Sequence, residues 1–140
     1  MMEYIKLFWE DAPEGDPSVK GCILRGVPTS FEQVIPVLQQ AVGKDSTQLL
    51  VPEDFPVGKM PLALADTFDK DILIVVGQND ERTPVWMAED IFAALPDGIE
   101  KGLWVAPGAK HGGMEAPEVL YPEEFVRRTI RFVEWSFQGE

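Results

Sequence analysis

The sequence has very few of the residues on which disulfides and zinc sites depend. Among its 140 residues there is one cysteine, Cys22, and one histidine, His111. An internal disulfide is therefore excluded, and a zinc site, which takes about four nitrogen or sulfur ligands, is not expected. A lone cysteine favours a reducing compartment, so we expect a cytoplasmic protein without a metal or other cofactor.

Positive charge and long apolar runs are also scarce. Twelve Lys and Arg stand against 24 Asp and Glu, which gives a net charge of −12. Nucleic acid and anionic membrane surfaces would repel such a protein, so we expect neither as a partner. No apolar run approaches about 18 residues, and no basic segment precedes a shorter one, so the pattern predicts neither a membrane span nor a secretion signal.

What the sequence does have is an alternation of strand and helix patterns along one domain. With 45% hydrophobic residues, the chain can bury a core without disulfide or metal support. Apolar runs at 19–25, 72–76 and 103–106 predict three strands. Because these runs are mostly apolar and alternate with helices, they predict a small, mainly parallel, three-stranded sheet covered on both faces. The predicted fold class is α/β.

Helical patterns lie on both sides of each predicted strand. Residues 1–10 predict a helix, and Ser30 begins a Ser-x-x-Gln capping box before a second one. Thr83 is the expected N-cap of a third helix, with Pro84 at its first position. Residues 43–69, with three prolines, predict an irregular loop or partial lid.

The last predicted helix begins near Pro122. An apolar stripe at steps of four, three and four residues is its expected buried face, made of Val126, Ile130, Val133 and Phe137.

Two polar residues each follow one of the predicted strands. Asp80 lies in Gly77-Gln78-Asn79-Asp80, and His111 lies in Pro107-Gly108-Ala109-Lys110-His111. The carboxyl ends of parallel strands meet at one edge of a sheet, so we expect the two side chains to lie side by side. The alternatives are that Asp80 only caps the following helix and that His111 is a loop histidine bonded to backbone.

From about Val19 to its end, the chain resembles the C-terminal half of an α/β-hydrolase, in the serine-hydrolase superfamily. The Asp80 segment, followed by Thr83-Pro84, resembles the acid loop of that family, and the His111 segment resembles its histidine loop. Their separation of 31 positions along the chain suits one helix and one strand between them. The resemblance implies that Asp80 orients His111, which acts as general base and then as general acid.

The chain departs from this family at the nucleophile. The family places a serine on a Gly-x-Ser-x-Gly turn before the acid, and no such turn occurs here. The serines lie in a turn, a helix start, the irregular region and the last helix: Ser18, Ser30, Ser46 and Ser136. Cys22 has nucleophile chemistry but falls within a predicted strand. With no nucleophile for the pair to activate and no oxyanion hole, we expect the chain alone to be inactive or nearly so.

The resemblance implies that residues 1–140 form a single truncated domain whose strands are the last three of the family. The uncovered edge near 19–25, or apolar residues such as Phe8 and Trp9 of the first helix, would then be open to a partner. We expect a homodimer through one of these surfaces. A non-enzymatic binding or assembly module is therefore the alternative function, and a small acyl-type ligand near Asp80 and His111 is a third possibility.

Overall fold

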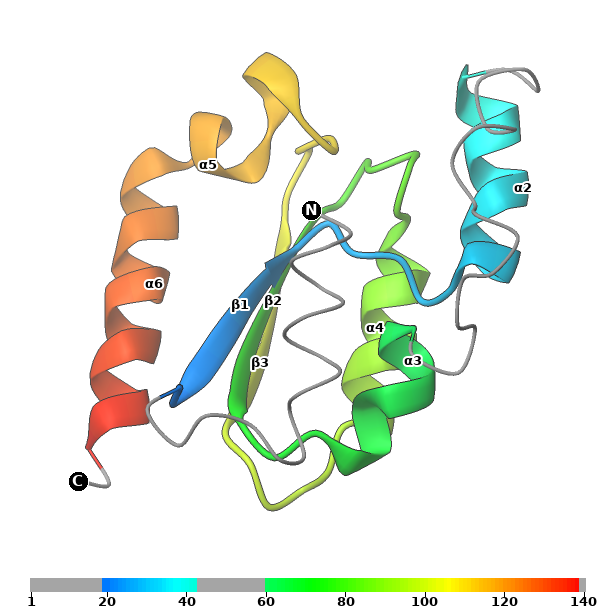
Figure 1. Cartoon of the computed structure of the whole chain (residues 1–140). Coiled ribbons are helices and arrows are strands. Elements are labelled where there is room, and N and C mark those ends of the chain that lie inside the picture. Colours follow the sequence, from blue (N-terminus) through cyan, green and yellow to red (C-terminus); the bar gives the residue numbers. More distant parts are fainter. Residues whose placement is uncertain (1–18, 43–59, 139–140) are drawn as a thin grey trace.

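Three short strands form a parallel sheet between two layers of helices (Figure 1). The computed structural model describes residues 19–42 and 60–138, so the helix expected at 1–10 lies outside the described residues. The strands are β1 (Gly21–Arg25), β2 (Asp71–Gly77) and β3 (Lys101–Ala106), in the order β1-β2-β3. Both pairings are parallel. The predicted fold class and all three predicted strands are confirmed.

One face of the sheet packs against α4 (Val85–Ala94). Alternate strand residues such as Leu24, Ile74 and Val76 meet Ala88 and Ile91 of this helix in one buried cluster. Ala88 and Ile91 belong to the buried face that an apolar repeat of 3.6 residues predicts for this helix. The period-two alternation of the strands sends the intervening residues to the opposite face.

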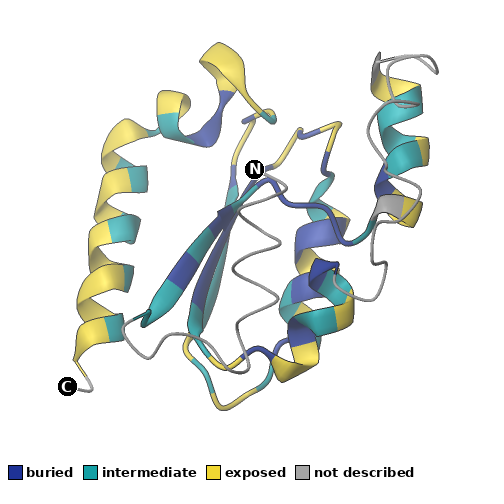
Figure 2. Cartoon of the chain, in the orientation of Figure 1, coloured by how far each residue is buried: buried dark blue, intermediate teal, exposed yellow. Residues whose placement is uncertain are grey.

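The opposite face packs against α6 (Pro122–Phe137). Phe125 and Phe132 of α6 lie against a cluster that includes Leu73, Val75 and Trp104. The predicted buried stripe of this helix is wrong. Val126, Ile130, Val133 and Phe137 are 53%, 52%, 44% and 50% exposed, and the outer side of α6 is coloured as exposed in Figure 2. The helix has two apolar stripes, and the aromatic one faces the sheet.

The remaining helices are short or peripheral. The helix α2 (Phe31–Val42) begins as expected, because the amide of Gln33 donates to Ser30 Oγ at 3.2 Å. Part of the expected irregular region is helical: α3 (Pro61–Leu64) and the 3₁₀ turn η3 (Ala65–Thr67) follow one another, and Phe68 after them is buried. Apolar burial of this segment outweighs its proline content. A second 3₁₀ turn, η4 (Gly113–Glu115), and α5 (Pro117–Leu120) lead into α6.

None of the helices in the described ranges has the length and apolar character that crossing a bilayer requires.

Candidate functional site

Asp80 and His111 lie together at the carboxyl ends of β2 and β3. His111 Nδ1 is 2.9 Å from Asp80 Oδ2, which is a hydrogen-bond distance. The carboxylate of Asp80 is fully buried, whereas the side chain of His111 is 22% exposed. The expected juxtaposition is therefore present, and the imidazole has one side in the protein and one side open to solvent.

Three further groups hold the carboxylate of Asp80. The backbone amides of Arg82 and Thr83 donate to Oδ1 at 2.9 and 2.8 Å, and the Thr83 hydroxyl donates to Oδ2 at 3.0 Å. Thr83 is therefore not the N-cap of α4: the helix begins at Val85, and Pro84 occupies the cap position. Asp80 thus bonds at once to the histidine and to the turn that precedes α4, but it does not cap this helix, which has no side-chain cap hydrogen bond.

These contacts also set the ionisation of Asp80. Burial raises the pKa of its carboxyl, because the charged form loses its water. The hydrogen bonds from His111 and from the amides of Thr83 and Arg82, together with the charge of His111, act in the opposite direction and prevail, so the pKa lies below its ordinary value. Asp80 is therefore a carboxylate at neutral pH and accepts the proton of His111 Nδ1.

The loop that carries Asp80 and the loop that carries His111 are bonded directly to each other. The Asn79 amide donates to Ala109 O at 2.8 Å, and the Gly108 amide donates to Gln78 Oε1 at 2.9 Å. At Gly77 the backbones approach so closely that a β-carbon would lie 2.8 Å from Lys110 O. Only glycine fits there, and this close approach brings the acid and the histidine within hydrogen-bond distance.

The imidazole also reaches the end of β1. Gly26, the residue after this strand, has φ +62°, and a β-carbon there would be 3.0 Å from His111 Cε1. Arg25 donates from its guanidinium to the carbonyl of His111 and forms an ion pair with Glu118 at 3.3 Å. His111 is thus carried by the loop after β3, bonded to the acid after β2 and packed on the glycine after β1.

A pocket of about 410 Å³ opens beside the imidazole. Its described lining is mostly polar: Ala41, Asn79, Glu81, Arg82, Lys110, His111, Gly112 and Gly113. Arg82 and Lys110 give this side of the histidine two cations, of which Lys110 pairs with Glu115 at 3.1 Å. The pocket is large enough for a small ligand.

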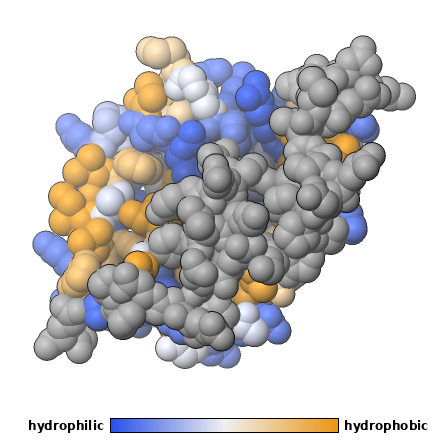
Figure 3. Space-filling view, in the orientation of Figure 1, coloured by the Kyte–Doolittle hydropathy of each residue, from blue (hydrophilic) through white to orange (hydrophobic). Residues whose placement is uncertain are grey.

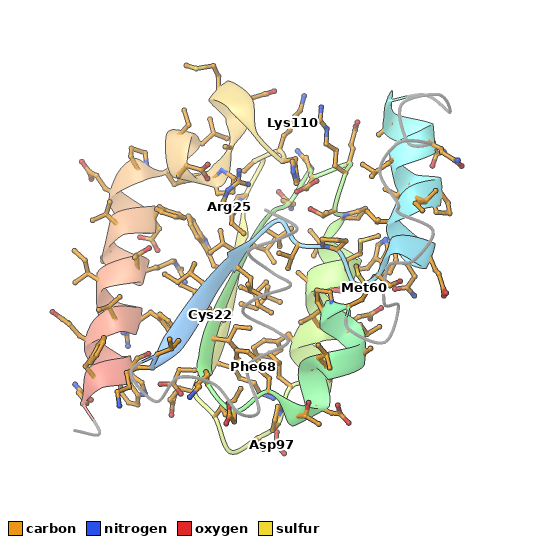
Figure 4. All side chains as sticks on the ribbon, in the orientation of Figure 1. Cys22, Arg25, Met60, Phe68, Asp97 and Lys110 are labelled. Carbon is orange, nitrogen blue, oxygen red and sulfur yellow. The ribbon has the colours of Figure 1, made fainter. Side chains whose placement is uncertain are left out.

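The described residues offer no nucleophile to the open side of the imidazole. Ser30 caps α2, and Ser136 Oγ lies near Gly21, at the start of β1. Cys22 lies along β1 (Figure 4), and burial raises the pKa of its thiol to about 12. A thiol that stays protonated in the core is a poor nucleophile.

Sequence reasoning missed the hydroxyl nearest to the ring. Thr83 Oγ1 is 3.2 Å from His111 Nδ1, whereas no hydroxyl was expected near the pair. It lies on the side of the imidazole that faces Asp80 and is buried, so it supports the carboxylate and is not placed for attack on a substrate. The Asp-x-x-Thr spacing from 80 to 83 is the sequence signal, because such a spacing favours a side-chain-bonded turn.

Among the described residues, no group of three or more His, Cys, Asp or Glu side chains is placed to hold a metal ion. The arrangement of Asp80 and His111 is suited to proton transfer, because the buried carboxylate accepts from Nδ1 and leaves Nε2 free to take up a proton.

Comparisons with known proteins match at the level of structure. No family model and no curated protein matches the sequence. The Mycobacterium tuberculosis puromycin-hydrolyzing peptidase is similar at 19% identity and a TM-score of 0.60, over 79% of this chain and 18% of that chain. The Pyrococcus horikoshii acylaminoacyl peptidase is similar at 16% identity and a TM-score of 0.66, over 93% of this chain and 22% of that chain. The Paleococcus ferrophilus monoacylglycerol lipase is similar at 19% identity and a TM-score of 0.54, over 94% of this chain and 64% of that chain.

The chain spans about a fifth of the length of the two peptidases. Sequence identities this low show similarity of fold and nothing about activity. The chain has the fold of part of an α/β-hydrolase domain.

Proposed function

We propose that this chain supplies the acid and the base of an acyl hydrolase, and that its nucleophile comes from a segment outside the described residues or from another chain. The observation that carries the proposal is the 2.9 Å contact between His111 Nδ1 and the buried Asp80 Oδ2. In the mechanism, Nε2 of His111 takes the proton of the attacking hydroxyl or thiol and then returns it to the departing ester or amide group. Asp80 stabilises the imidazolium that forms in between.

The position of the ring supports a particular origin for the nucleophile. His111 lies against Gly26, which follows β1, and β1 has no strand on its outer edge in the described ranges. A parallel strand added to this edge would end beside the imidazole, on the side away from Asp80. The nucleophile therefore belongs at the carboxyl end of a strand that pairs with β1. Where that strand belongs to another chain, this chain alone hydrolyses no ester above the rate in buffer.

The first test uses the fact that His111 is the only histidine in the chain. Nitrogen-15 NMR of the neutral imidazole should report the Nδ1–H tautomer, because the proton is held by Asp80. Asp80→Asn removes that preference. A wild-type protein in the Nε2–H tautomer would contradict the proposal, since its free nitrogen would then face the carboxylate.

The second test restores the missing group. The chain is joined to an upstream segment that carries a strand and a Gly-x-Ser-x-Gly turn from an esterase of this fold. We expect hydrolysis of a p-nitrophenyl ester, reduced about 10³-fold or more in His111→Ala and in Asp80→Asn. A folded fusion whose activity is the same in both variants would contradict a role for these residues.

We also propose a second candidate function, a homodimeric binding or assembly module. Besides the open edge of β1, the apolar residues on the outer side of α6 support it, because half-exposed side chains of this size favour burial against a partner. Figure 3 shows apolar side chains gathered at the left of the molecule, where Figure 1 places α6 in the same orientation. Sedimentation at micromolar concentration should then give a dimer, and Ile130→Glu should shift it towards monomer. A stable monomer at that concentration contradicts this candidate.

A further inference from the structure

The outer edge of β3 has no strand partner within the described ranges. The amide of Ile72 donates to Glu100 O and the amide of Gln78 donates to Ala106 O, both at 2.9 Å. In a parallel strand, the peptide groups of successive residues face alternately one neighbouring strand and the other. From Glu100 to Ala106, every second residue therefore bonds to β2. The peptide groups that point outward belong to Lys101, Leu103 and Val105. Their amides and carbonyls form an open edge for another strand.

A hollow of about 440 Å³ runs between this edge and α6. Leu73, Gly102 and Phe132 are among its lining residues, and at Gly102 the absence of a side chain keeps the space above the strand open. Three of the five arginines of the chain line it, Arg127, Arg128 and Arg131, against one acid, Glu100. Lys101 also borders the hollow, but its ammonium bonds to Leu95 O at 3.0 Å, away from the arginines.

The positive charge of this hollow is not fully neutralised by the chain. Arg127 and Arg128 share one carboxylate, Glu124, at 2.6 Å each. Arg131 has no ion pair or hydrogen bond to the described residues. Arg128 lies 5.0 Å above the ring of Trp104, which fixes its position on the sheet. In a chain with a net charge of −12, this cluster is a local site of opposite sign.

We propose that the edge of β3 binds an acidic peptide in extended conformation, which adds to the sheet as a further strand. Main-chain hydrogen bonds to the outward groups of β3 supply the affinity, and alternate side chains supply the selectivity. Acidic side chains on the α6 side meet the three arginines. Apolar side chains on the other side cover Leu103 and Val105, which are partly buried against the core.

A second copy of this chain is a poorer occupant. If two copies paired through β3 in one continuous sheet, their arginine clusters would face each other across the new pairing, and like charges would repel. An acidic strand has the complementary charge. This inference uses neither Asp80 nor His111, so it does not depend on the proposed function.

The test compares two fluorescent peptides, one alternating Glu and Val and the other alternating Lys and Val. Fluorescence anisotropy should report binding of the Glu peptide alone, and the affinity should fall as salt is added. Arg131→Glu should weaken binding roughly tenfold. Lys110→Glu makes the same change of charge at the carboxyl end of the sheet, near the top of Figure 4, and should leave the affinity within about twofold. Equal binding of both peptides, or none by the Glu peptide, overturns the proposal.

A change in the peptide backbone distinguishes strand addition from simple charge attraction, because only strand addition needs the amide hydrogens of the peptide. A Glu-Val peptide N-methylated at every residue keeps its charge but carries a methyl group in place of each amide hydrogen, so neither of its edges can form the ladder and we expect it to lose binding. In the complex with the unmodified peptide, the amides of Leu103 and Val105 should exchange more slowly with solvent. Binding that survives N-methylation, or amides that exchange as fast as in the free protein, overturns the proposal.

Discussion

The imidazole of His111 packs on Gly26, the residue that follows β1. A β-carbon at Gly26 would lie 3.0 Å from Cε1 and 3.1 Å from Nδ1 of the ring. The space that the glycine leaves empty is therefore the space the histidine needs to reach Asp80. One residue without a side chain therefore links the end of the first strand to the geometry of Asp80 and His111.

We expect Gly26→Ala to be destabilising and to displace the ring. The substitution adds a methyl group against the imidazole and also forces alanine into φ +62°, which costs about 1 kcal/mol before the contact is counted. Urea unfolding should show a loss of about 2 kcal/mol or more. Gly98→Ala is the control, because no atom lies within 4 Å of a β-carbon there. Equal stability of the two variants contradicts the close contact.

Thr83→Val tests whether the hydroxyl supports the acid. Valine keeps the shape of the side chain but removes the donor at 3.0 Å from Asp80 Oδ2. A buried charged acceptor that loses a hydrogen bond costs about 1–3 kcal/mol. The free energy of unfolding should fall by that amount, and Thr83→Ser, which keeps the hydroxyl, should lose less. If Thr83→Ser loses as much as Thr83→Val, packing and not the hydroxyl explains the effect.

The helix α6 provides a matched pair of substitutions. Phe132→Ala removes an aromatic side chain that packs on the sheet and should cost about 3 kcal/mol. Ile130→Ala changes a residue that is 52% exposed and should cost less than about 1 kcal/mol. Urea unfolding of both variants decides which stripe faces the core. A larger loss in Ile130→Ala would restore the stripe predicted from the sequence.

The failure of that prediction has a physical reason. Steps of four and three residues mark an apolar stripe, but α6 has a second stripe about a third of a turn away that contains Phe125 and Phe132. Hydrophobic periodicity finds a face and cannot rank two of them. The choice depends on shape, because the aromatic side chains fit beside Trp104, with ring centres of Phe125 and Trp104 6.4 Å apart.

The sheet and the Asp80–His111 pair could be predicted from the sequence because no second pattern competed with the one that marks them. Apolar runs bounded by turns admit one arrangement as buried parallel strands, and residues that follow two such strands must emerge at the same edge. The role of Thr83 was not accessible in this way. Its N-cap position is a local preference, and in the structure its hydroxyl donates to the buried carboxylate of Asp80 while α4 begins two residues later, at Val85.

Cys22 should be inert in the folded protein. Burial raises the pKa of its thiol to about 12, so very little thiolate exists at neutral pH, and the side chain is shielded as well. A disulfide reagent that reports free thiols should react slowly at pH 8 and should label one thiol per chain after unfolding in urea. Rapid labelling of the native protein would mean that β1 opens readily.

The low pKa of Asp80 makes a defined contribution to the acid stability of the fold. Its pKa is lower in the folded chain than in the unfolded chain, so the unfolded state takes up a proton first as the pH falls. The stabilisation is therefore complete above the ordinary carboxyl pKa of about 3.9 and is lost as the pH falls through the folded value. Urea unfolding between about pH 6 and pH 2 should show a smaller dependence on pH in Asp80→Asn than in the wild type. Asp69→Asn, at an exposed position, should follow the wild-type curve. If Asp80→Asn also follows the wild-type curve, then the carboxylate of Asp80 is not preferentially stabilised in the folded state, and the hydrogen bond with His111 loses its main support.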